Sequence, residues 1–229
     1  MKYPSLIIDN FFDNPDEIRD YANDCEWYRV DRIIGYRTED LTGSDKHREF
    51  FHFIAHKLLL LIDPHNTRDI RYRANLFFQK QIPGKSHLDG WVHKDGAELS
   101  AIMYLNKNDT FGTNLYKRKH QWSEGVITHE GGQGENVKHR GFINCEKPDF
   151  DEEEFLKDRS KNNDNFEMTA EIKGLYNRLF MFDSASYHAM VTPPPAEDKD
   201  ERLILMIMFH DIYKHNFKNG LIESKRFTI

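Results

Sequence analysis

The sequence predicts a mainly β protein with supporting helices, a jelly roll whose N-terminal helices pack on one sheet. From Tyr72 onward, short runs rich in β-branched and aromatic residues follow one another. Two helical segments come before them, so the order of elements does not fit an alternating α/β fold. Short strands that bury both faces are typical of two packed sheets. The expected strands cover residues 73–82, 90–93, 99–105, 114–117, 166–172, 178–182, 187–191 and 202–209.

Two helices are expected before the strands. Asn14 can cap the first helix, with Pro15 at its first position, and this helix should cover residues 15–23. Ser44 can cap a second helix, in which apolar residues recur every three or four positions. That spacing gives one apolar face, so the second helix should lie against a sheet. Its apolar positions are Phe50, Ile54, Leu58 and Leu61.

The 229 residues are expected to form a single domain. Residues 1–70 should contribute an N-terminal strand and the supporting helices, and residues 71–212 the β core. A polar stretch at 120–165, with several glycines and an acidic run, shows little apolar periodicity. We expect it to be an insertion in the core, and the sequence leaves open whether it is a lid or a disordered loop.

The composition favours a cytoplasmic protein. Charged residues make up 31% of the chain and the mean hydropathy is -0.76. No apolar run reaches the roughly 18 residues of a spanning helix, and the start lacks the features of a signal peptide. Cys25 and Cys145 are far apart and predict neither a disulfide framework nor a cysteine zinc site. With a formal charge of -6, neither nucleic acid nor a membrane is an expected partner.

Two His-x-Asp triplets are the first candidates for chemistry. They run from His87 to Asp89 and from His93 to Asp95, and chance alone accounts for such a triplet in a chain with 12 histidines. Either triplet could therefore belong to a solvated loop. On an extended segment residues i and i+2 share a face, so His93 and Asp95 can point together into a barrel while Lys94 turns away. A third imidazole would complete the two-histidine, one-carboxylate ligand set of non-haem Fe(II) sites.

His188 is the candidate for that third ligand, and Arg202 is the candidate for binding an anion nearby. His188 follows an apolar strand and a short turn, which would place it at the mouth of a barrel; the alternative is a structural core histidine. Arg202 begins an apolar run, where burial of its guanidinium would require an anionic partner. The planar fork of that group matches a carboxylate with two parallel hydrogen bonds. The alternative is an edge arginine whose charged end reaches water.

Six segments around these residues occur in a characteristic order. They read QIPG at 81–84, WVHKD at 91–95, SAIMYLN at 100–106, FGTNLY at 111–116, NRLFMFDSASYH at 177–188 and RLILMIMF at 202–209. In this order they resemble the prolyl-4-hydroxylase-like branch of the Fe(II)- and 2-oxoglutarate-dependent oxygenases, over residues 73–210. The resemblance favours His93 over His87, because the family places its ligand pair just before the strand that reads Tyr-Leu-Asn.

The resemblance implies a double-stranded β-helix, the cupin-like form of the jelly roll, and an enzyme of the dioxygenase class. His93, Asp95 and His188 would be its catalytic residues and would bind Fe(II), while Arg202 and Tyr104 would bind the co-substrate 2-oxoglutarate. The enzyme would also use O2, with ascorbate as an optional reductant. It would hydroxylate a protein side chain or a small molecule and release succinate and CO2.

Some features depart from the family pattern, and other functions stay open. Ile82 stands where many relatives have a tyrosine, which leaves Gln79 or Gln81 as a second partner of the co-substrate carboxylate. Gly112 and Thr113 replace a more common Gly-Gly pair. The alternative functions are a non-catalytic jelly-roll binding module and a cupin-like metalloenzyme that does not use 2-oxoglutarate. The apolar first helices could form the face of a homodimer.

Overall fold

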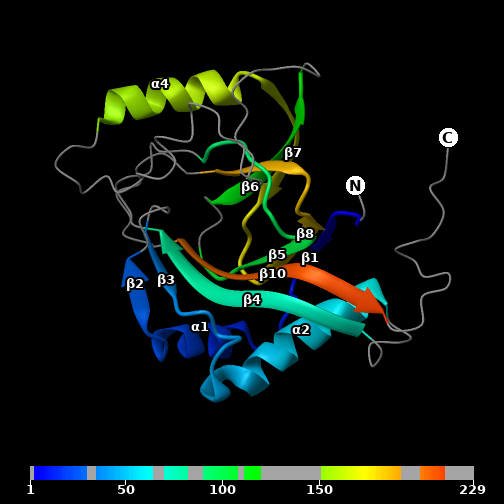
Figure 1. The fold of residues 1–229 in the computed structure, drawn as a ribbon. Coiled ribbons are helices and arrows are strands. Elements are labelled where there is room, and N and C mark those ends of the chain that lie inside the picture. The colour runs from blue at the N-terminus through cyan, green and yellow to red at the C-terminus, as the bar shows by residue number, and fades with distance from the viewer. Residues whose placement is uncertain are drawn as a thin grey trace.

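Two antiparallel sheets with helices outside them make up the protein (Figure 1). The computed structural model describes residues 3–29, 35–63, 70–81, 90–107, 111–119, 151–191 and 202–214. Its helices are α1 (Pro15–Asn23), the 3-10 turn η1 (Asp45–His47), α2 (Arg48–Ile62) and α4 (Glu152–Asn163). Its strands are β1 (Leu6–Ile8), β2 (Trp27–Arg29), β3 (Tyr36–Thr38), β4 (Ile70–Gln81), β5 (Leu99–Tyr104), β6 (Gly112–Arg118), β7 (Phe166–Lys173), β8 (Arg178–Asp183), β9 (Tyr187–Val191) and β10 (Arg202–Lys214).

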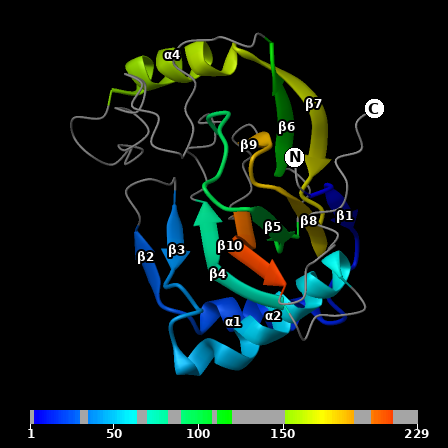
Figure 2. The same ribbon diagram turned by 45° about the vertical axis from the view of Figure 1, so that its right-hand side comes forward.

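The two sheets pack face to face as a jelly roll, which confirms the predicted fold class. The major sheet has seven strands in the order β1-β8-β5-β10-β4-β3-β2, and the minor sheet has three in the order β7-β6-β9. Figure 2 shows the minor sheet above the major one. An apolar cluster joins them, because Ile172 of β7 packs with Ile102 of β5 and with Phe180 and Phe182 of β8.

Strand β10 lies at the centre of the major sheet, between β5 and β4. Its side chains alternate between two hydrophobic cores, one under the helices and one between the sheets. Leu205 and Ile207 pack toward the helices, whereas Ile204 belongs to the cluster between the sheets. Because both faces are buried, the strand reads as a continuous apolar run rather than as an alternating one.

Helices α1 and α2 cover the outer face of the major sheet (Figure 2). Helix α1 spans the predicted residues and has a proline in its first turn. The N-cap of α2 is His47, which makes no side-chain capping hydrogen bond. The predicted cap, Ser44, lies one short turn earlier, where its Oγ accepts a hydrogen bond of 3.2 Å from Lys46 N. That cap begins η1, which leads into α2. On α2 the buried residues are Ile54, Ala55, Leu58 and Leu59.

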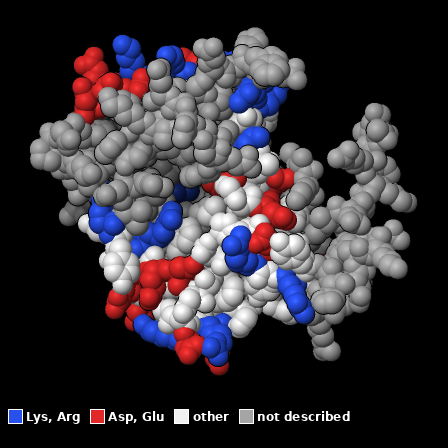
Figure 3. Space-filling model, viewed as in Figure 1, with Lys and Arg blue, Asp and Glu red and all other residues white. Residues whose placement is uncertain are grey.

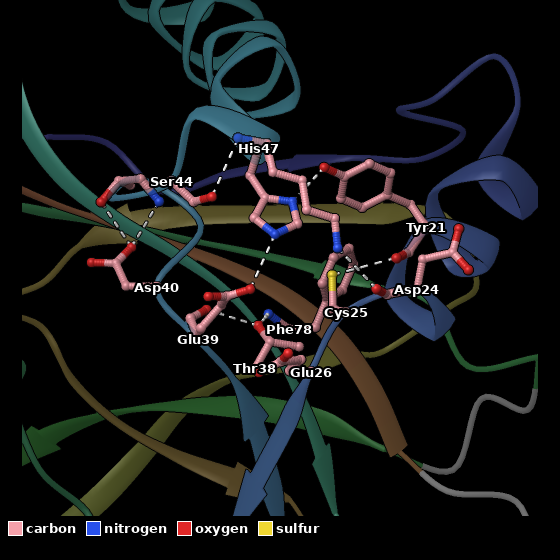
Figure 4. A network of polar contacts seen from close by, with 12 residues as sticks. Tyr21, Asp24, Cys25, Glu26, Thr38, Glu39, Asp40, Ser44, His47 and Phe78 are labelled. Atoms are coloured by element: carbon pink, nitrogen blue, oxygen red, sulfur yellow. Dashed lines mark hydrogen bonds and ion pairs between the residues drawn. The ribbon is translucent and has the colours of Figure 1, made fainter.

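A buried histidine joins these helices to strand β3 (Figure 4). The side chain of His47 is 1% exposed; its Nδ1 lies 2.6 Å from Tyr21 Oη of α1, and its Nε2 lies 3.1 Å from Glu39 Oε1. Next to Glu39, Thr38 Oγ1 accepts a hydrogen bond of 3.0 Å from Phe78 N of β4. The end of β3 is therefore fixed to a helix on one side and to β4 on the other.

Several elements differ from the expectations. The two short strands β2 and β3 extend the major sheet, and helix α4 occupies the end of the segment expected to be an insertion. The rest of that segment, 120–150, lies outside the described residues. The expected strand at 90–93 is not a strand: within it, only His93 forms an isolated bridge, to His188.

Charged side chains of both signs lie close together over the described part of the face in Figure 3. No helix in the described part of the chain is both long and apolar enough to cross a membrane.

Candidate metal centre

His93, Asp95 and His188 converge between the two sheets. Each offers one ligand atom, and these atoms lie within 4.8 Å of one another. Two backbone hydrogen bonds join the segment of His93 to β9, from His93 N to His188 O at 3.0 Å and from His188 N to His93 O at 2.9 Å. These two hydrogen bonds bring His93 and His188, which are distant in sequence, next to each other.

Both imidazoles turn the same nitrogen toward the carboxylate. His93 Nε2 lies 3.5 Å from Asp95 Oδ1, and His188 Nε2 lies 3.3 Å from Asp95 Oδ2. On the other side of each ring, Nδ1 faces a backbone carbonyl, that of Trp91 at 2.7 Å and that of Ser186 at 3.0 Å. A carbonyl only accepts, so each Nδ1 must carry the proton. Each Nε2 is then the ring nitrogen that would present its lone pair to a bound metal.

The Asp95 carboxylate is buried and held from several sides. Its backbone N donates to Ser184 O at 3.0 Å, and Ser100 Oγ donates to Asp95 Oδ2 at 3.2 Å. Burial alone would raise the pKa of the carboxyl, but the interactions with His188 and His93 outweigh it and hold that pKa well below its usual range. The carboxylate is therefore available in its charged, metal-binding form.

The segment that carries His93 and Asp95 is fixed by the C-terminal end of α4. Val92 N donates to Asn163 Oδ1 at 2.9 Å, and Asn163 Nδ2 donates to Gly90 O at 3.2 Å. The neighbouring Asn162 is fully buried and donates to Val92 O at 3.1 Å. Lys94 points to the other side, where its Nζ lies 4.5 Å from the centre of the Tyr187 ring. His93 and Asp95 thus share one face, as their spacing predicts.

Arg202 lies in the same interior, at the start of β10. It is 3% exposed, and its guanidinium carbon lies 5.9 Å from the centre of the Tyr104 ring. Its Nε is buried without a hydrogen bond, and no described acid pairs with it. Burial lowers the pKa of this guanidinium, and the nearby Tyr104 opposes that shift. A buried cation without a partner acid provides a binding position for an anion.

Tyr104 is itself fully buried beside this cation. Its hydroxyl donates to Thr113 Oγ1 of β6 at 2.7 Å, which links the two sheets. Burial raises its pKa, while Arg202 and the bond to Thr113 act in the opposite direction. The ring fits because the neighbouring residue is Gly174, where an added Cβ would lie 2.7 Å from Tyr104 Cδ1.

Comparison with solved structures shows which fold surrounds this centre. HygX from Streptomyces hygroscopicus, with nickel and 2-oxoglutarate bound, is 9% identical at a TM-score of 0.53, over 89% of this chain and 82% of that chain. The non-heme alpha ketoglutarate dependent epimerase SnoN from nogalamycin biosynthesis is 10% identical at a TM-score of 0.51, over 98% and 84%. A Pseudomonas putida prolyl-4-hydroxylase is 15% identical at a TM-score of 0.48, over 90% and 91%. The first two comparisons show that this chain shares their fold, as the resemblance implied.

A family model also matches the sequence. The model described as Family of unknown function (DUF6445) matches residues 70–202, which is more than half of the chain. The protein belongs to this family. Comparison with curated protein sequences gives no match.

In this DUF6445 protein, the donor atoms suit a non-haem Fe(II) ion. Two imidazole nitrogens and one carboxylate oxygen form the two-histidine, one-carboxylate set that leaves coordination positions open for other ligands. The protonated Nδ1 atoms support this role, because such hydrogen bonds orient histidine ligands. Arg202, which pairs with no described acid, independently points to an anion in the same interior.

Some residues at the site were not foreseen from the sequence, and others lie outside the described part. Ser100 and Thr113 join the centre through hydrogen bonds that depend on strand register. Arg37 of β3 donates to Gln79 Oε1 at 3.0 Å, so this proposed co-substrate partner is engaged by an arginine. The His87–Asp89 triplet, Ile82 and the side chain of Gln81 are outside the described residues.

Proposed function

We propose that this protein is an Fe(II)- and 2-oxoglutarate-dependent oxygenase that hydroxylates its substrate and releases succinate and CO2. The proposal depends on the buried guanidinium of Arg202, which pairs with no acid of the described residues and lies in the interior that holds His93, Asp95 and His188. An anion with two carboxylates can bind the metal with one end and the guanidinium of Arg202 with the other. Its 2-oxo acid end would reach the metal and its far carboxylate would reach Arg202.

The residues of the chain would position the reactants rather than supply the oxidising power. Fe(II) with 2-oxoglutarate and O2 would supply the chemistry that oxidises an unactivated C–H bond. His93, Asp95 and His188 would hold the metal on one face. Arg202 and the Tyr104 hydroxyl would orient the co-substrate, and the apolar cluster around Phe180 and Phe182 would exclude water.

Anaerobic thermal melting with Mn(II), with and without 2-oxoglutarate, tests the proposal. A ligand that binds only the native state adds about 2.7 kcal/mol at a hundredfold excess over its dissociation constant. We expect His93→Ala and His188→Ala to abolish both effects and Arg202→Ala to abolish only that of 2-oxoglutarate. His56→Ala, at an exposed position of α2, is the control.

The result also separates the alternative functions. A metal effect without any effect of 2-oxoglutarate would favour a metalloenzyme that does not use this co-substrate. Absence of both effects would favour a binding module. Failure of the iron-loaded protein to form succinate with any class of substrate, or without substrate, would also overturn the proposal.

A further inference from the structure

Strand register places Arg37 on the inner face of the major sheet. Arg37 lies opposite Gln79 of β4, Gln79 opposite Ile204 of β10, and Ile204 opposite Tyr104 of β5. Residues that pair directly across neighbouring strands share a face. Ile204 and Tyr104 belong to the cluster between the sheets, so Arg37 faces the same interior from its edge. On the next strand, β2, the exposed ring of Tyr28 lies opposite Arg37.

The guanidinium of Arg37 is held in place, but no acid of the described residues forms an ion pair with it. Its carbon lies 3.9 Å from the centre of the Phe77 ring, and one terminal nitrogen donates to Gln79 Oε1 at 3.0 Å. Its Nε is buried without a hydrogen bond, and it forms no ion pair with a described acid. Burial lowers its pKa, and the charge of Asp95 opposes that shift, which places Arg37 within the electrostatic range of the metal centre. Stacking on a ring leaves the edge of an arginine fork free for an anion.

The backbone after Arg37 is anchored, so the side chain is presented by a fixed strand. Thr38 accepts from Phe78 N, and Glu39 contacts the buried His47 (Figure 4). A fixed arginine loses less freedom when it binds than a mobile one.

Arg37 and Arg202 occupy separate places. Arg202 lies beside the ring of Tyr104 on β5, whereas Arg37 lies over Phe77 on β4, on the other side of β10. Bound Fe(II), doubly charged 2-oxoglutarate, Asp95 and Arg202 would balance one another with both imidazoles neutral. Arg178, on the same face as Tyr104, is already paired with Asp9. With metal and co-substrate bound, the positive charge of Arg37 would have no counter-charge among these groups.

We infer that Arg37 binds a carboxylate of the substrate, so that the enzyme acts on a carboxylic acid that enters along the β2–β3 edge. The inference rests on the proposed function and deepens it. The carboxylate would accept hydrogen bonds from the free edge of the guanidinium, and the exposed ring of Tyr28 would pack against the body of the substrate. The C–H bond to be oxidised would then lie between Arg37 and the metal ligands.

Matched pairs of probes test this inference on the full chain. We would titrate N-acetylated amino acids and their primary amides into the anaerobic complex with Mn(II) and saturating 2-oxoglutarate, and measure binding by calorimetry. The variants are Arg37→Gln, Arg37→Lys and the control Arg29→Gln, whose side chain leaves the same pair of strands on the opposite face. We expect the wild type and Arg29→Gln to bind one or more acids better than the matching amides. Arg37→Gln should weaken those acids about tenfold or more without changing the binding of 2-oxoglutarate or of the amides.

The possible results are distinct. Arg37→Lys, which keeps the charge without the fork, should recover part of the preference, and melting of the metal-free variants shows that they fold. An unchanged preference in Arg37→Gln, or no preference for acids in a wild type that binds 2-oxoglutarate, overturns the inference. Weaker 2-oxoglutarate binding in Arg37→Gln assigns Arg37 to the co-substrate instead. If Mn(II) and 2-oxoglutarate do not bind the wild type at all, the proposed function fails and the inference fails with it.

Discussion

At the scale of single residues, we expect the buried charge of Arg202 to lower the free energy of unfolding of the protein when no ligand is bound. Its guanidinium is buried and pairs with no acid in the described part of the chain, and replacing such a charge by an apolar group of similar size is often neutral or stabilising by about 1–4 kcal/mol. We expect Arg202→Met to leave the metal-free protein at least as stable as the wild type in urea unfolding. The same variant should lose all stabilisation by 2-oxoglutarate. A large loss of stability without ligands would show that Arg202 has a structural partner.

Gly174 should be required for the position of Tyr104. A Cβ at this residue would lie 2.7 Å from Tyr104 Cδ1 and 2.6 Å from the backbone oxygen of Phe111. We expect Gly174→Ala to destabilise the protein by about 1–3 kcal/mol in urea unfolding and to weaken binding of 2-oxoglutarate. Gly43→Ala is the matched control, because its nearest contact, Asp40 O, lies 3.9 Å away. Equal effects of the two substitutions would contradict this account.

The candidate ligands could be predicted residue by residue, but their surroundings could not. The i, i+2 spacing places His93 and Asp95 on one face in any extended segment. The contact between Ser100 and Asp95, and that between Thr113 and Tyr104, depend on register and on the packing of two sheets. Arg37 was missed for the same reason, since only pairing with β4 turns it inward.

At the scale of elements, helix α4 should control metal binding from a distance. Asn163 bridges Val92 N and Gly90 O, next to His93. We expect Asn163→Ala to weaken Mn(II) binding about 10–100-fold, which is typical when groups that orient ligands are removed. Calorimetric titration measures this effect. Asn165→Ala is the control, because among the described residues that side chain donates to the carbonyls of Lys161 and Asn162 at the end of the same helix and not to residues 90–95. If both variants bind metal like the wild type, α4 does not orient the segment.

Elements with a local signal were predicted, and those that depend on tertiary contacts were not. Helix α1 has a proline start and acidic first turn, and β10 has an uninterrupted apolar run. Strands β2 and β3 have three residues each, too few for alternation to stand out. The sequence of helix α4 has no apolar stripe that would predict its position. Its contacts with residues 90–92 are instead hydrogen bonds with asparagine side chains.

At the scale of the whole molecule, the site joins the two sheets. His188 belongs to β9 of the minor sheet, whereas Arg202 and Tyr104 belong to the major sheet. The segment of His93 is held to β9 by two hydrogen bonds. Bound metal and co-substrate should therefore stabilise the packing of the two sheets against any opening that separates them. Helices α1 and α2 pack only on the outer face of the major sheet and contribute no candidate ligand.

Hydrogen exchange should show this difference directly. With Mn(II) and a hundredfold excess of 2-oxoglutarate, an opening that separates the sheets should become about a hundredfold rarer, because the ligands bind only the closed form. We expect slower exchange at the amides of residues 90–95, of β9 and of the start of β10. Local fraying of α1 and α2 leaves the sheets together, so exchange there should stay the same. Slowing confined to the helices would place the ligands elsewhere, and slowing only at 90–95 and β9 would mean that the metal binds without a bridge to Arg202.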